Sequence, residues 1–271
     1  MSSACRQTIL NMQGVAFSYT EGSPFVRDLG LNVCEGEFIG LLGANGSGKS
    51  TILKLGSGIL KPSTGSVSLW GKPLRSYANK DRAKLISYLP QTIDITVPFT
   101  VAEVVGMGMY PYDISPSMTK EEALTLVGLE EKRDTNLNDL SGGEQRRVFI
   151  AMTLLQGAGL LLLDEPLANL DIKYQIEIVR LLRQLNKERN ISVVMALHDI
   201  NLALQFEKVI LIQPGSILGV GSPEVILTEE RIRHAFGVDV KIIRHPGGKA
   251  YISYESNFSQ PIQERGAPGS G

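Results

Sequence analysis

The sequence predicts an α/β fold built on a mainly parallel β-sheet, with helices packed against both of its faces. Short apolar runs that suit buried strands alternate with segments of helical periodicity along much of the chain. Leu160–Leu163 is such a run, Ile172–Arg189 is a long helical segment, and Ser192–Leu197 is the next strand. This alternation is typical of a parallel sheet covered on both faces. The 271 residues, 43% of them hydrophobic, are enough for a substantial core.

The N-terminal part of the chain is expected to be mainly β-structure. We expect strands over Thr8–Phe17, Phe25–Val33 and Ser66–Trp70, which form an N-terminal antiparallel β-subdomain. Phe38–Leu42 and Leu85–Leu89 are shorter apolar runs that suit buried strands.

The middle of the chain changes to helical periodicity, which predicts an α-helical subdomain at about residues 92–155, inserted in the α/β core. The candidate helices are Val101–Met109, Thr119–Val127 and Gly142–Gln156. The whole domain, with its α/β core and the inserted helices, is expected to cover residues 7–242. Residues 243–271 then form a C-terminal extension, whose glycine-rich end is expected to be disordered.

The segment that follows Phe38–Leu42 matches the pattern G-x-x-x-x-G-K-[ST]. It reads Gly43-Ala44-Asn45-Gly46-Ser47-Gly48-Lys49-Ser50-Thr51. Glycines let such a loop wrap its backbone N–H groups around a polyphosphate, and the next helix adds the positive end of its dipole. Lys49 would reach the β- and γ-phosphates, and the Ser50 hydroxyl would take a coordination position on Mg²⁺. The sequence therefore predicts a P-loop NTPase core.

Two carboxylates, Asp164 and Glu165, follow directly after the apolar run Leu160–Leu163. An open α/β sheet places its ligands at the carboxyl ends of its strands. We expect Asp164 to complement Ser50 at the Mg²⁺, and Glu165 to polarise a water molecule for attack on the γ-phosphate. On their own these residues would be better explained as an ordinary acidic turn. The phosphate-binding loop earlier in the chain decides for the functional interpretation.

A third motif reads Leu140-Ser141-Gly142-Gly143-Glu144-Gln145-Arg146-Arg147. Ser141 is a good N-cap for an amphipathic helix, so the motif predicts a second anion-binding helix N-terminus. In this order and spacing, the three motifs resemble those of ABC-type ATPases, in which this motif is called the signature motif. The resemblance covers the chain from Thr8 to about Tyr251.

The resemblance implies roles for further residues. Tyr19 lies where the family has an aromatic ring that stacks on adenine. Gln91 matches the glutamine that contacts Mg²⁺ and the attacking water, and His198 matches the switch histidine that contacts the γ-phosphate. Asp171 matches an aspartate at the subunit interface, although Leu167 stands where that motif more often has threonine.

The resemblance also implies that two copies of the chain pair head to tail. Each nucleotide would lie between the phosphate-binding loop of one copy and the signature motif of the other, because one chain is not expected to close both around one nucleotide. The residues expected to bind ATP are Tyr19, Gly43, Asn45, Gly46, Ser47, Gly48, Lys49, Ser50, Thr51, Ser141, Gly142, Gly143, Glu144 and Asp171. The expected catalytic residues are Lys49, Gln91, Glu165 and His198, and the expected Mg²⁺ ligands are Ser50, Gln91 and Asp164.

Two other stretches narrow the resemblance. Phe99–Val105, followed by Gly108–Tyr112, is similar to a stretch in the ATPases of iron-siderophore, haem and cobalamin importers, although Met109 replaces the usual arginine region. Leu197–Ala203 resembles the segment LHDLNLA of that group. The resemblance implies an ATP-hydrolysing subunit on the cytoplasmic face of the inner membrane. Its partners would be a second copy, two transmembrane permease subunits and, indirectly, an extracytoplasmic substrate-binding protein.

Composition argues against other classes of protein. The net charge of −1 and the pI of about 6.3 give no basic field that would attract nucleic acid. No stretch of the sequence approaches the roughly 18 apolar residues of a membrane span. Cys5 and Cys34 lie in no metal-binding pattern and are expected to be small hydrophobic residues rather than a disulfide.

Three other functions share part of this sequence pattern. A soluble ABC ATPase of the iron–sulfur assembly type, acting on a cytosolic protein partner, would keep the same ATP motifs and stays open as the alternative. An ABC ATPase acting on nucleic acid would need a second nucleotide domain, a coiled coil or a basic face, and the sequence has none of these. A kinase or GTPase would leave Leu140–Glu144 unexplained.

Overall fold

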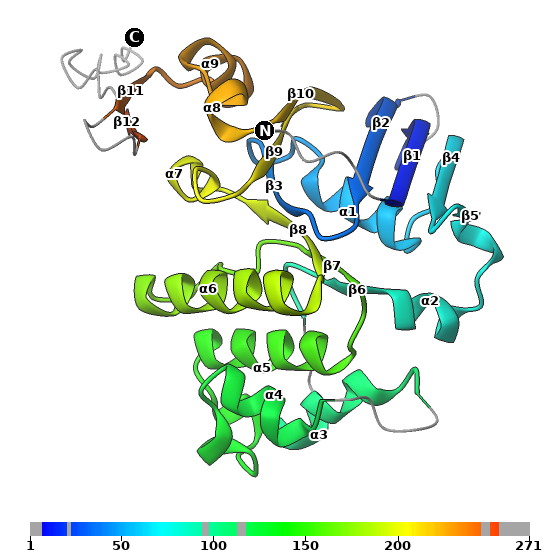
Figure 1. The fold of residues 1–271 in the computed structure, drawn as a ribbon, viewed down its shortest axis with the longest axis vertical. Coiled ribbons are helices and arrows are strands. Elements are labelled where there is room, and N and C mark those ends of the chain that lie inside the picture. The colour runs from blue at the N-terminus through cyan, green and yellow to red at the C-terminus, as the bar shows by residue number, and fades with distance from the viewer. Residues whose placement is uncertain (1–6, 21–22, 94–97, 113–117, 245–249, 255–271) are drawn as a thin grey trace, which may run out of the picture.

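The computed structural model describes residues 7–20, 23–93, 98–112, 118–244 and 250–254. A six-stranded sheet lies between an antiparallel sheet and a group of helices (Figure 1). This arrangement confirms the predicted α/β fold with its mainly parallel sheet, its N-terminal antiparallel β-subdomain and its helical subdomain. No helix in the described part of the chain combines the length and the hydropathy that a membrane crossing requires.

The six-stranded sheet has the strand order β10-β9-β3-β8-β7-β6. Its strands are β3 (Phe38–Leu42), β6 (Ile86–Leu89), β7 (Leu160–Leu163), β8 (Ser192–Leu197), β9 (Lys208–Gln213) and β10 (Ser216–Gly221). All neighbouring pairs are parallel except β9 and β10, which are antiparallel. The carboxyl ends of β3, β8, β7 and β6 therefore lie side by side at one edge, where the segments that follow these strands converge.

Strand β7 shows how the sheet separates two hydrophobic cores. Leu161 and Leu163 belong to the core shared with helices α5 and α6, whereas Leu160 and Leu162 belong to the core shared with helix α1 and the antiparallel sheet. These helices are α1 (Lys49–Ser57), α5 (Gly142–Leu155) and α6 (Ile172–Arg189). All four leucines are at most 1% exposed, because successive side chains of a strand point to opposite faces and both faces are covered.

The antiparallel sheet has the order β2-β1-β4-β5. Its strands are β1 (Thr8–Phe17), β2 (Val26–Cys34), β4 (Thr64–Leu69) and β5 (Lys72–Pro73). Cys34 ends β2 opposite Thr8 and is disulfide-bonded. The expectation that Cys34 takes part in no disulfide is therefore wrong, because the sequence alone did not reveal which segment this strand pairing brings beside it. Cys5 lies outside the described residues.

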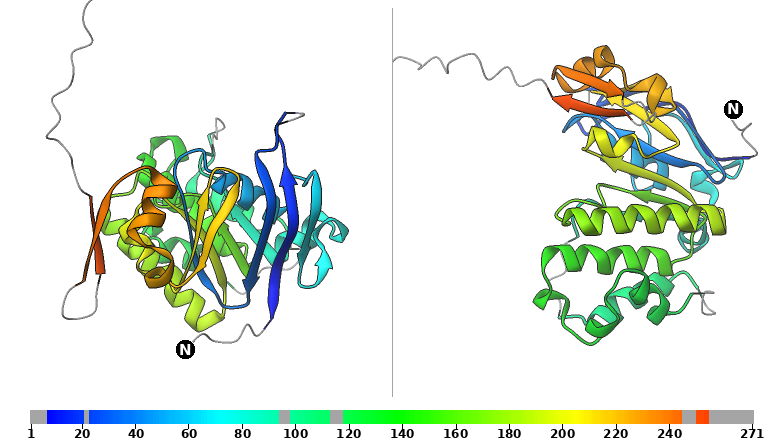
Figure 2. Two further views of the ribbon diagram at one scale, coloured as in Figure 1. Left: turned by 90° about the horizontal axis from the view of Figure 1, so that it is seen from above. Right: turned by 60° about the vertical axis from the view of Figure 1, so that its left-hand side comes forward.

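The helical subdomain lies beyond α6 on the side of the six-stranded sheet opposite the antiparallel sheet (Figure 2). Its helices are α3 (Val101–Gly106), α4 (Lys120–Leu126) and α5, with short 3₁₀ turns at Met107–Met109, Glu130–Lys132 and Leu137–Asp139. Helices α3 and α4 both begin with a capping box, formed by Thr100 with Glu103 and by Thr119 with Glu122. The limits 92–155 for this subdomain stay a prediction.

The remaining elements follow the core or connect its parts. They are a 3₁₀ turn (Leu74–Ser76), α2 (Asn79–Leu85), α7 (Ile200–Ala203), α8 (Pro223–Ile226), α9 (Glu229–Phe236), β11 (Val240–Arg244) and β12 (Ala250–Tyr254). Strands β11 and β12 form a hairpin, and the predicted domain boundary at 242 falls inside β11. Asn201 of α7 anchors this hairpin by exchanging two hydrogen bonds with the backbone of Ile252. The expected disordered end of the chain lies outside the described residues.

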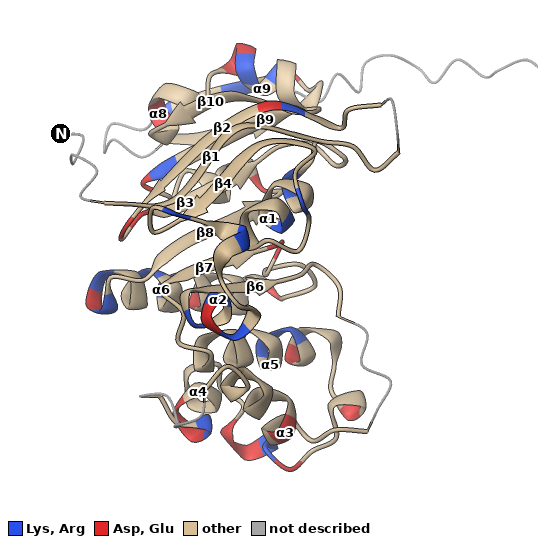
Figure 3. Ribbon diagram, turned by 90° about the vertical axis from the view of Figure 1, so that its right-hand side faces the viewer, with Lys and Arg blue, Asp and Glu red and all other residues tan. Residues whose placement is uncertain are grey.

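Helix α2 and strand β10 are among the elements that were not predicted from the sequence. Helix α2 has no buried residue, so it carries no apolar periodicity that could have revealed it. Strand β10 contains Gly219 and Gly221 and is only half-buried, which weakens the strand pattern. Basic and acidic residues are interspersed on α2, α4, α6 and α9 (Figure 3).

Candidate functional site

The phosphate-binding loop connects the carboxyl end of β3 to helix α1, as predicted. Its glycines are required by geometry. Gly48 is the N-cap of α1 and has a φ of 108°, a conformation that residues with a side chain rarely adopt. A Cβ atom on Gly43 would lie 2.7 Å from the Ser47 hydroxyl oxygen and 2.8 Å from the Ile212 carbonyl oxygen. The loop can therefore keep this path only with glycine at both positions.

Lys49, the first residue of α1, is 4% exposed. Its ammonium group donates hydrogen bonds to the carbonyl oxygens of Gly43 (2.8 Å) and Ala44 (3.2 Å), and its Nζ lies 3.8 Å from Glu165 Oε1. Burial lowers the pKa of Lys49, and the negative charges of Glu165 and Asp164 partly offset this effect. A buried cation thus faces two carboxylates across the loop.

Asp164 and Glu165 follow β7 and are both buried, at 1% and 7% exposure. Asp164 Oδ2 accepts a hydrogen bond from the Tyr88 hydroxyl (3.3 Å), whereas its Oδ1 has no hydrogen-bond partner. Desolvation by burial raises the pKa of Asp164, and a hydrogen bond from the Ser50 side chain acts in the opposite direction. Asp164 therefore presents a buried, incompletely satisfied carboxylate next to the loop.

Glu165 adopts the left-handed backbone conformation, with a φ of 49°, which is uncommon for a residue with a side chain. Its carboxylate is surrounded by polar groups from three other segments. Gln91 Nε2 donates a hydrogen bond to Glu165 Oε2 (2.6 Å), and His198 Nε2 forms a close contact with the same oxygen. Lys49 approaches the other oxygen, as described above. Backbone strain of this kind is often found where a side chain must be aimed precisely.

These groups line one cleft of about 370 Å³. The predicted site residues that line it are Tyr19, Asn45, Gly46, Gly48, Lys49, Ser50, Thr51, Gln91, Glu165 and His198. Gly43, Ser47 and Asp164 lie behind its surface, since they are buried. These residues are far apart in the sequence, but the structure brings them together. All except Tyr19 follow parallel strands of the same sheet, whereas Tyr19 follows β1.

Tyr19 lies at the mouth of this cleft and is 59% exposed. Its hydroxyl group shares a hydrogen bond with the Thr51 hydroxyl (2.9 Å). Its ring packs edge-on against Phe17 and Phe25, with ring centroids 4.8 and 5.4 Å away. One face of an exposed and well-supported aromatic ring can receive a planar base by stacking.

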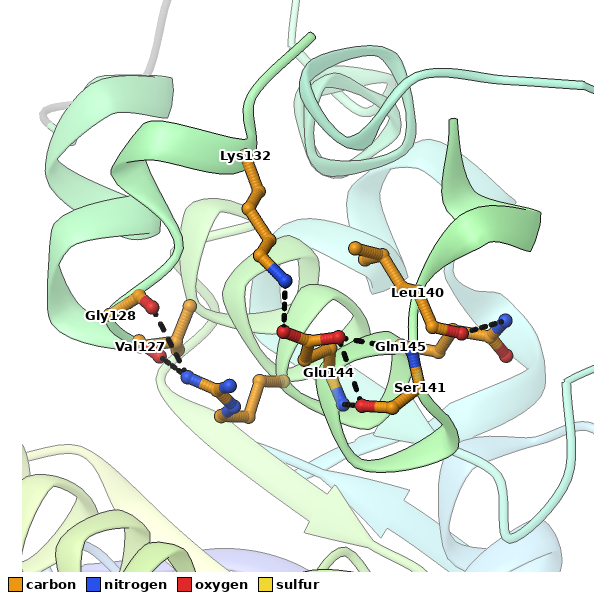
Figure 4. Close-up of polar contacts among 8 residues, drawn as sticks. Val127, Gly128, Lys132, Leu140, Ser141, Glu144 and Gln145 are labelled. Atoms are coloured by element: carbon orange, nitrogen blue, oxygen red, sulfur yellow. Dashed lines mark hydrogen bonds and ion pairs between the residues drawn. The ribbon is translucent and has the colours of Figure 1, made fainter. Parts of the chain in front are cut away.

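The signature motif forms the N-terminus of α5, where Ser141 is the N-cap and forms a capping box with Glu144. Glu144 also forms a close ion pair with Lys132, which Figure 4 shows on the opposite side of its carboxylate from Ser141. The bonds from Lys132 and from the Ser141 backbone hold the pKa of Glu144 at about 2. The Ser141 side chain accepts a hydrogen bond from the Glu144 N–H (3.3 Å).

The signature motif does not line the cleft of its own chain. Ser141 and Gly142 are exposed, and Gly143 lies beside Asn169, whose carbonyl oxygen would be 3.3 Å from a Cβ atom at Gly143. Asp171 is the exposed N-cap of α6, and its side chain makes no capping hydrogen bond. The predicted site residues therefore fall into two groups on one chain: those around the cleft and an exposed group around Ser141 and Asp171.

Three further residues of the site were missed by sequence reasoning. Phe25 lines the cleft, and Tyr88 binds Asp164. Arg146 binds the backbone carbonyl groups on either side of Glu165, those of Asp164 and Pro166, and the carbonyl groups of Pro90 and Gln91. No signal in the sequence singles out Phe25 or Tyr88. Arg146 stands inside the signature motif, and the apolar residues that follow it indicate a buried helix, so a cation there could have been recognised.

Comparison with known proteins identifies relatives that are named as import ATP-binding proteins. Residues 26–168 match the family profile described as ABC transporter. The hemin import ATP-binding protein HmuV of Bordetella avium is 37% identical over 250 residues, which cover 88% of this chain and 96% of that protein. The iron(3+)-hydroxamate import ATP-binding protein FhuC of Bacillus subtilis is 37% identical over 229 residues, which cover 82% of this chain and 85% of that protein.

The chain is also similar to solved structures. The ATP-binding cassette MJ0796, solved as a dimer in a post-hydrolysis state bound to ADP and Pi, aligns with a TM-score of 0.72 at 30% sequence identity. The alignment covers 79% of this chain and 99% of that one. The residues that match the family profile, 26–168, contain the phosphate-binding loop, the signature motif and the two carboxylates that follow β7.

Proposed function

We propose that this chain, which belongs to the ABC transporter family, binds and hydrolyses ATP to drive the import of an iron chelate or haem through membrane permease subunits. The observation that carries the proposal is the single cleft in which the loop lysine Lys49 and the carboxylate Glu165 meet Gln91 and His198. The printed names of the relatives, hemin import and iron-hydroxamate import, support the class of cargo.

In this proposal the loop holds the triphosphate of ATP. Lys49 exchanges its hydrogen bonds to Gly43 and Ala44 for oxygens of the β- and γ-phosphates, while backbone N–H groups at the start of α1 bind the remaining oxygens. The adenine base stacks on Tyr19, whose exposed ring lies at the mouth of the cleft. Residues of the phosphate-binding loop and Tyr19 both line the cleft.

Glu165 is the residue that we assign as general base. A water molecule attacks the γ-phosphorus, its proton passes to Glu165, and the bond from the γ-phosphorus to the bridging oxygen breaks, so that ADP leaves with that oxygen. Gln91 and His198 contact the same carboxylate oxygen and therefore hold the base in one orientation. Correct orientation of the base and the water accounts for much of the rate enhancement in reactions of this class.

The residues present fit a Mg²⁺ ion bound together with ATP. Asp164 Oδ1 is buried and lacks a partner, and the Ser50 hydroxyl hydrogen-bonds the same carboxylate, so two hard oxygen donors are available. No group of three or more His, Cys, Asp and Glu residues in the described part of the chain could hold a metal alone. We assign Ser50, Gln91 and Asp164 as the protein ligands. When bound, Mg²⁺ neutralises charge on the phosphate oxygens.

We further propose that two copies pair head to tail, so that Ser141, Gly143 and Asp171 of one copy complete the ATP site of the other. Ser141 and Asp171 are exposed, Gly143 is half-buried, and none of the three lines the cleft of its own chain, which supports this arrangement. A dimeric ATP-binding cassette among the structural relatives supports it as well. ATP would then hold the dimer closed, and hydrolysis would remove the γ-phosphate contacts and let it open.

The dimer would act beneath two transmembrane permease subunits on the cytoplasmic face of the inner membrane, with an extracytoplasmic binding protein delivering the cargo. The helical subdomain, to which Gln91 leads, is the part that we expect to receive the permease. The competing function, a soluble ATPase of the iron–sulfur assembly type, would use the same cleft with a cytosolic protein partner instead of the permease.

Two experiments test the proposal. Lys49→Ala should abolish ATP binding or hydrolysis by the purified full chain, whereas Lys61→Ala, an exposed lysine in a turn, should leave both unchanged. Equal activity in the two variants would contradict the assignment of the loop. For the transport role, a tagged chain should co-purify from membranes with a polytopic permease. Co-purification with a cytosolic partner alone would favour the competing function.

A further inference from the structure

Helix α5 carries two adjacent buried arginines, Arg146 and Arg147, at 6% and 5% exposure. Arg146 donates hydrogen bonds to the backbone of two segments that carry residues of the cleft. Its Nε donates to the Pro166 carbonyl (3.1 Å), its Nη2 to the Asp164 carbonyl (2.7 Å), and its Nη1 to the Pro90 carbonyl (2.7 Å). Nη1 also lies 3.2 Å from the Gln91 carbonyl. One guanidinium group therefore connects α5 with the segments that follow β6 and β7.

The contacts of Arg146 are directed at backbone rather than at a counter-ion. Within the described part of the chain Arg146 forms no ion pair. Burial lowers the pKa of Arg146 to about 10, while the charges of Asp164 and Glu165 favour its charged form, so the group is protonated at neutral pH. A buried cation whose hydrogen bonds go to four carbonyls fixes the relative position of the segments that carry them.

These segments carry the catalytic groups. The Gln91 carbonyl is itself one of the acceptors, and Glu165 lies between Asp164 and Pro166, whose carbonyl groups both accept hydrogen bonds from Arg146. Arg146 touches neither the cleft nor the predicted phosphate positions. It therefore acts on hydrolysis only through the backbone of Gln91 and Glu165.

Arg146 is also close to Ser141, the residue that completes the ATP site of the partner copy in the proposed dimer. Ser141 begins α5 and Arg146 lies five residues along it, about 7.5 Å at the helical rise of 1.5 Å per residue. In the proposed dimer Ser141 meets the nucleotide held by the partner copy. A shift of α5 at Ser141 would thus reach Gln91 and Glu165 through one rigid helix and one side chain.

We propose that Arg146 is a positioning residue that couples the two nucleotide sites of the dimer, by fixing Gln91 and Glu165 to the helix whose N-terminus contacts the partner's nucleotide. The proposal rests on the proposed function and on head-to-tail pairing. It goes beyond them because it assigns a role to one side chain. Through Arg146, the presence of a nucleotide at one site would affect hydrolysis at the other.

Arg147 provides a matched control. It stands on the same helix and is equally buried, but its Nη1 donates to the carbonyl groups of Val127 (2.7 Å) and Gly128 (3.2 Å) at the end of α4. Its guanidinium also lies 4.0 Å from the centre of the Tyr174 ring. These partners belong to the helical subdomain and to α6, away from the cleft. Figure 4 shows Val127 and Gly128 on the far side of Glu144 from Leu140.

The test compares Arg146→Met with Arg147→Met in the purified full-length chain, by measuring ATP hydrolysis as a function of ATP concentration. Both variants should lose stability to a similar extent. Arg146→Met should lower kcat about 10–100-fold, as expected when a supporting contact of a catalytic group is lost, with KM changed less than about threefold. The wild type should show cooperativity in ATP, and Arg146→Met should abolish it. Arg147→Met should keep kcat within about threefold and keep the cooperativity.

Arg146→Lys, which keeps the charge and can bind some of the carbonyl groups, should recover part of both losses, and it replaces the Met variant if the latter does not fold. Equal kcat in the Arg146 and Arg147 variants, or unchanged cooperativity in the Arg146 variants, would overturn the proposal. So would a wild-type curve without cooperativity. If neither the wild type nor Arg147→Met hydrolyses ATP, the proposed function itself fails, so the two failures are distinguishable.

Discussion

Replacing Glu165 with glutamine is the perturbation that separates ATP binding from hydrolysis most cleanly. Glutamine has the same shape, so the side chain can stay in its buried position, where Gln91, His198 and Lys49 surround it. What is lost is the carboxylate that would accept a proton from the attacking water. Lys49 and the phosphate-binding loop are unchanged, so ATP binding should persist.

The size of the effect follows from this single lost function. A positioned general base contributes about 10²–10⁴ in rate, which corresponds to about 2.7–5.4 kcal/mol in the activation barrier at 1.36 kcal/mol per tenfold. Single-turnover hydrolysis with excess enzyme and Mg²⁺ measures the chemical step, and equilibrium binding of ATP measures affinity separately. We expect the first to fall by this factor and the second to stay within about threefold of the wild type.

The matched control for this experiment is Glu188→Gln. Glu188 is an exposed residue of α6 whose carboxylate accepts a hydrogen bond from Gln184. The two substitutions are chemically identical, so only their places in the structure differ. A Glu165→Gln variant that hydrolyses ATP as fast as Glu188→Gln would refute the assignment of Glu165 as the base.

Three further predictions concern the signature motif and Asp164. Ser141→Ala removes the side-chain cap of α5 and should lower the free energy of unfolding by about 1 kcal/mol, measured by urea denaturation; an unchanged midpoint would show that the cap contributes nothing. The bonds of Glu144 to Lys132 and to the Ser141 backbone depress its pKa from 4.5 to about 2. Because the folded-state pKa is the lower one, the stability that the charged form contributes is fully present above pH 4.5 and is lost as the pH falls toward 2. The stability difference between wild type and Glu144→Gln in an acid titration should shrink over that window, and a constant difference would contradict the account. Tyr88→Phe removes the hydroxyl that donates to Asp164 Oδ2 and should raise the Mg²⁺ concentration for half-maximal ATPase activity several-fold at unchanged maximal rate; an unchanged Mg²⁺ dependence would exclude that role for Tyr88.

The fold could be predicted because most of its elements have a local signal. The apolar run Leu160–Leu163 and the long amphipathic segment Ile172–Arg189 have in the structure the same limits that the sequence indicated. Helix α2, by contrast, buries no side chain, so its formation depends on its place between β5 and β6 rather than on a pattern of its own. The disulfide of Cys34 depends on strand pairing, which periodicity does not reveal.

The candidate site was predictable to the extent that its residues belong to recognisable motifs. The carboxyl ends of parallel strands explain why Gln91, Glu165 and His198 meet, since sheet topology brings the ends of β6, β7 and β8 side by side. Tyr88 could not be predicted, because it acts through a hydroxyl group that reaches Asp164 only across the pairing of β6 with β7. The contacts of Arg146 could not be predicted either, because its partners are backbone carbonyl groups, which every residue type has.

The central claim is that one ATP molecule is held jointly by two copies of the chain, and the mass of the Glu165→Gln variant in solution tests it most directly. The chain has a mass of 29.5 kDa. Light scattering during size-exclusion chromatography should give about this mass without nucleotide and about twice this mass with ATP and Mg²⁺. Adding Gly143→Asp, which places a negative charge in the exposed signature motif, should prevent the doubling while ATP still binds to the loop. A Glu165→Gln variant with Gly143 intact that binds ATP but keeps a mass near 29.5 kDa would contradict the shared site. So would a doubled mass without ATP, or a doubled mass that persists after Gly143→Asp.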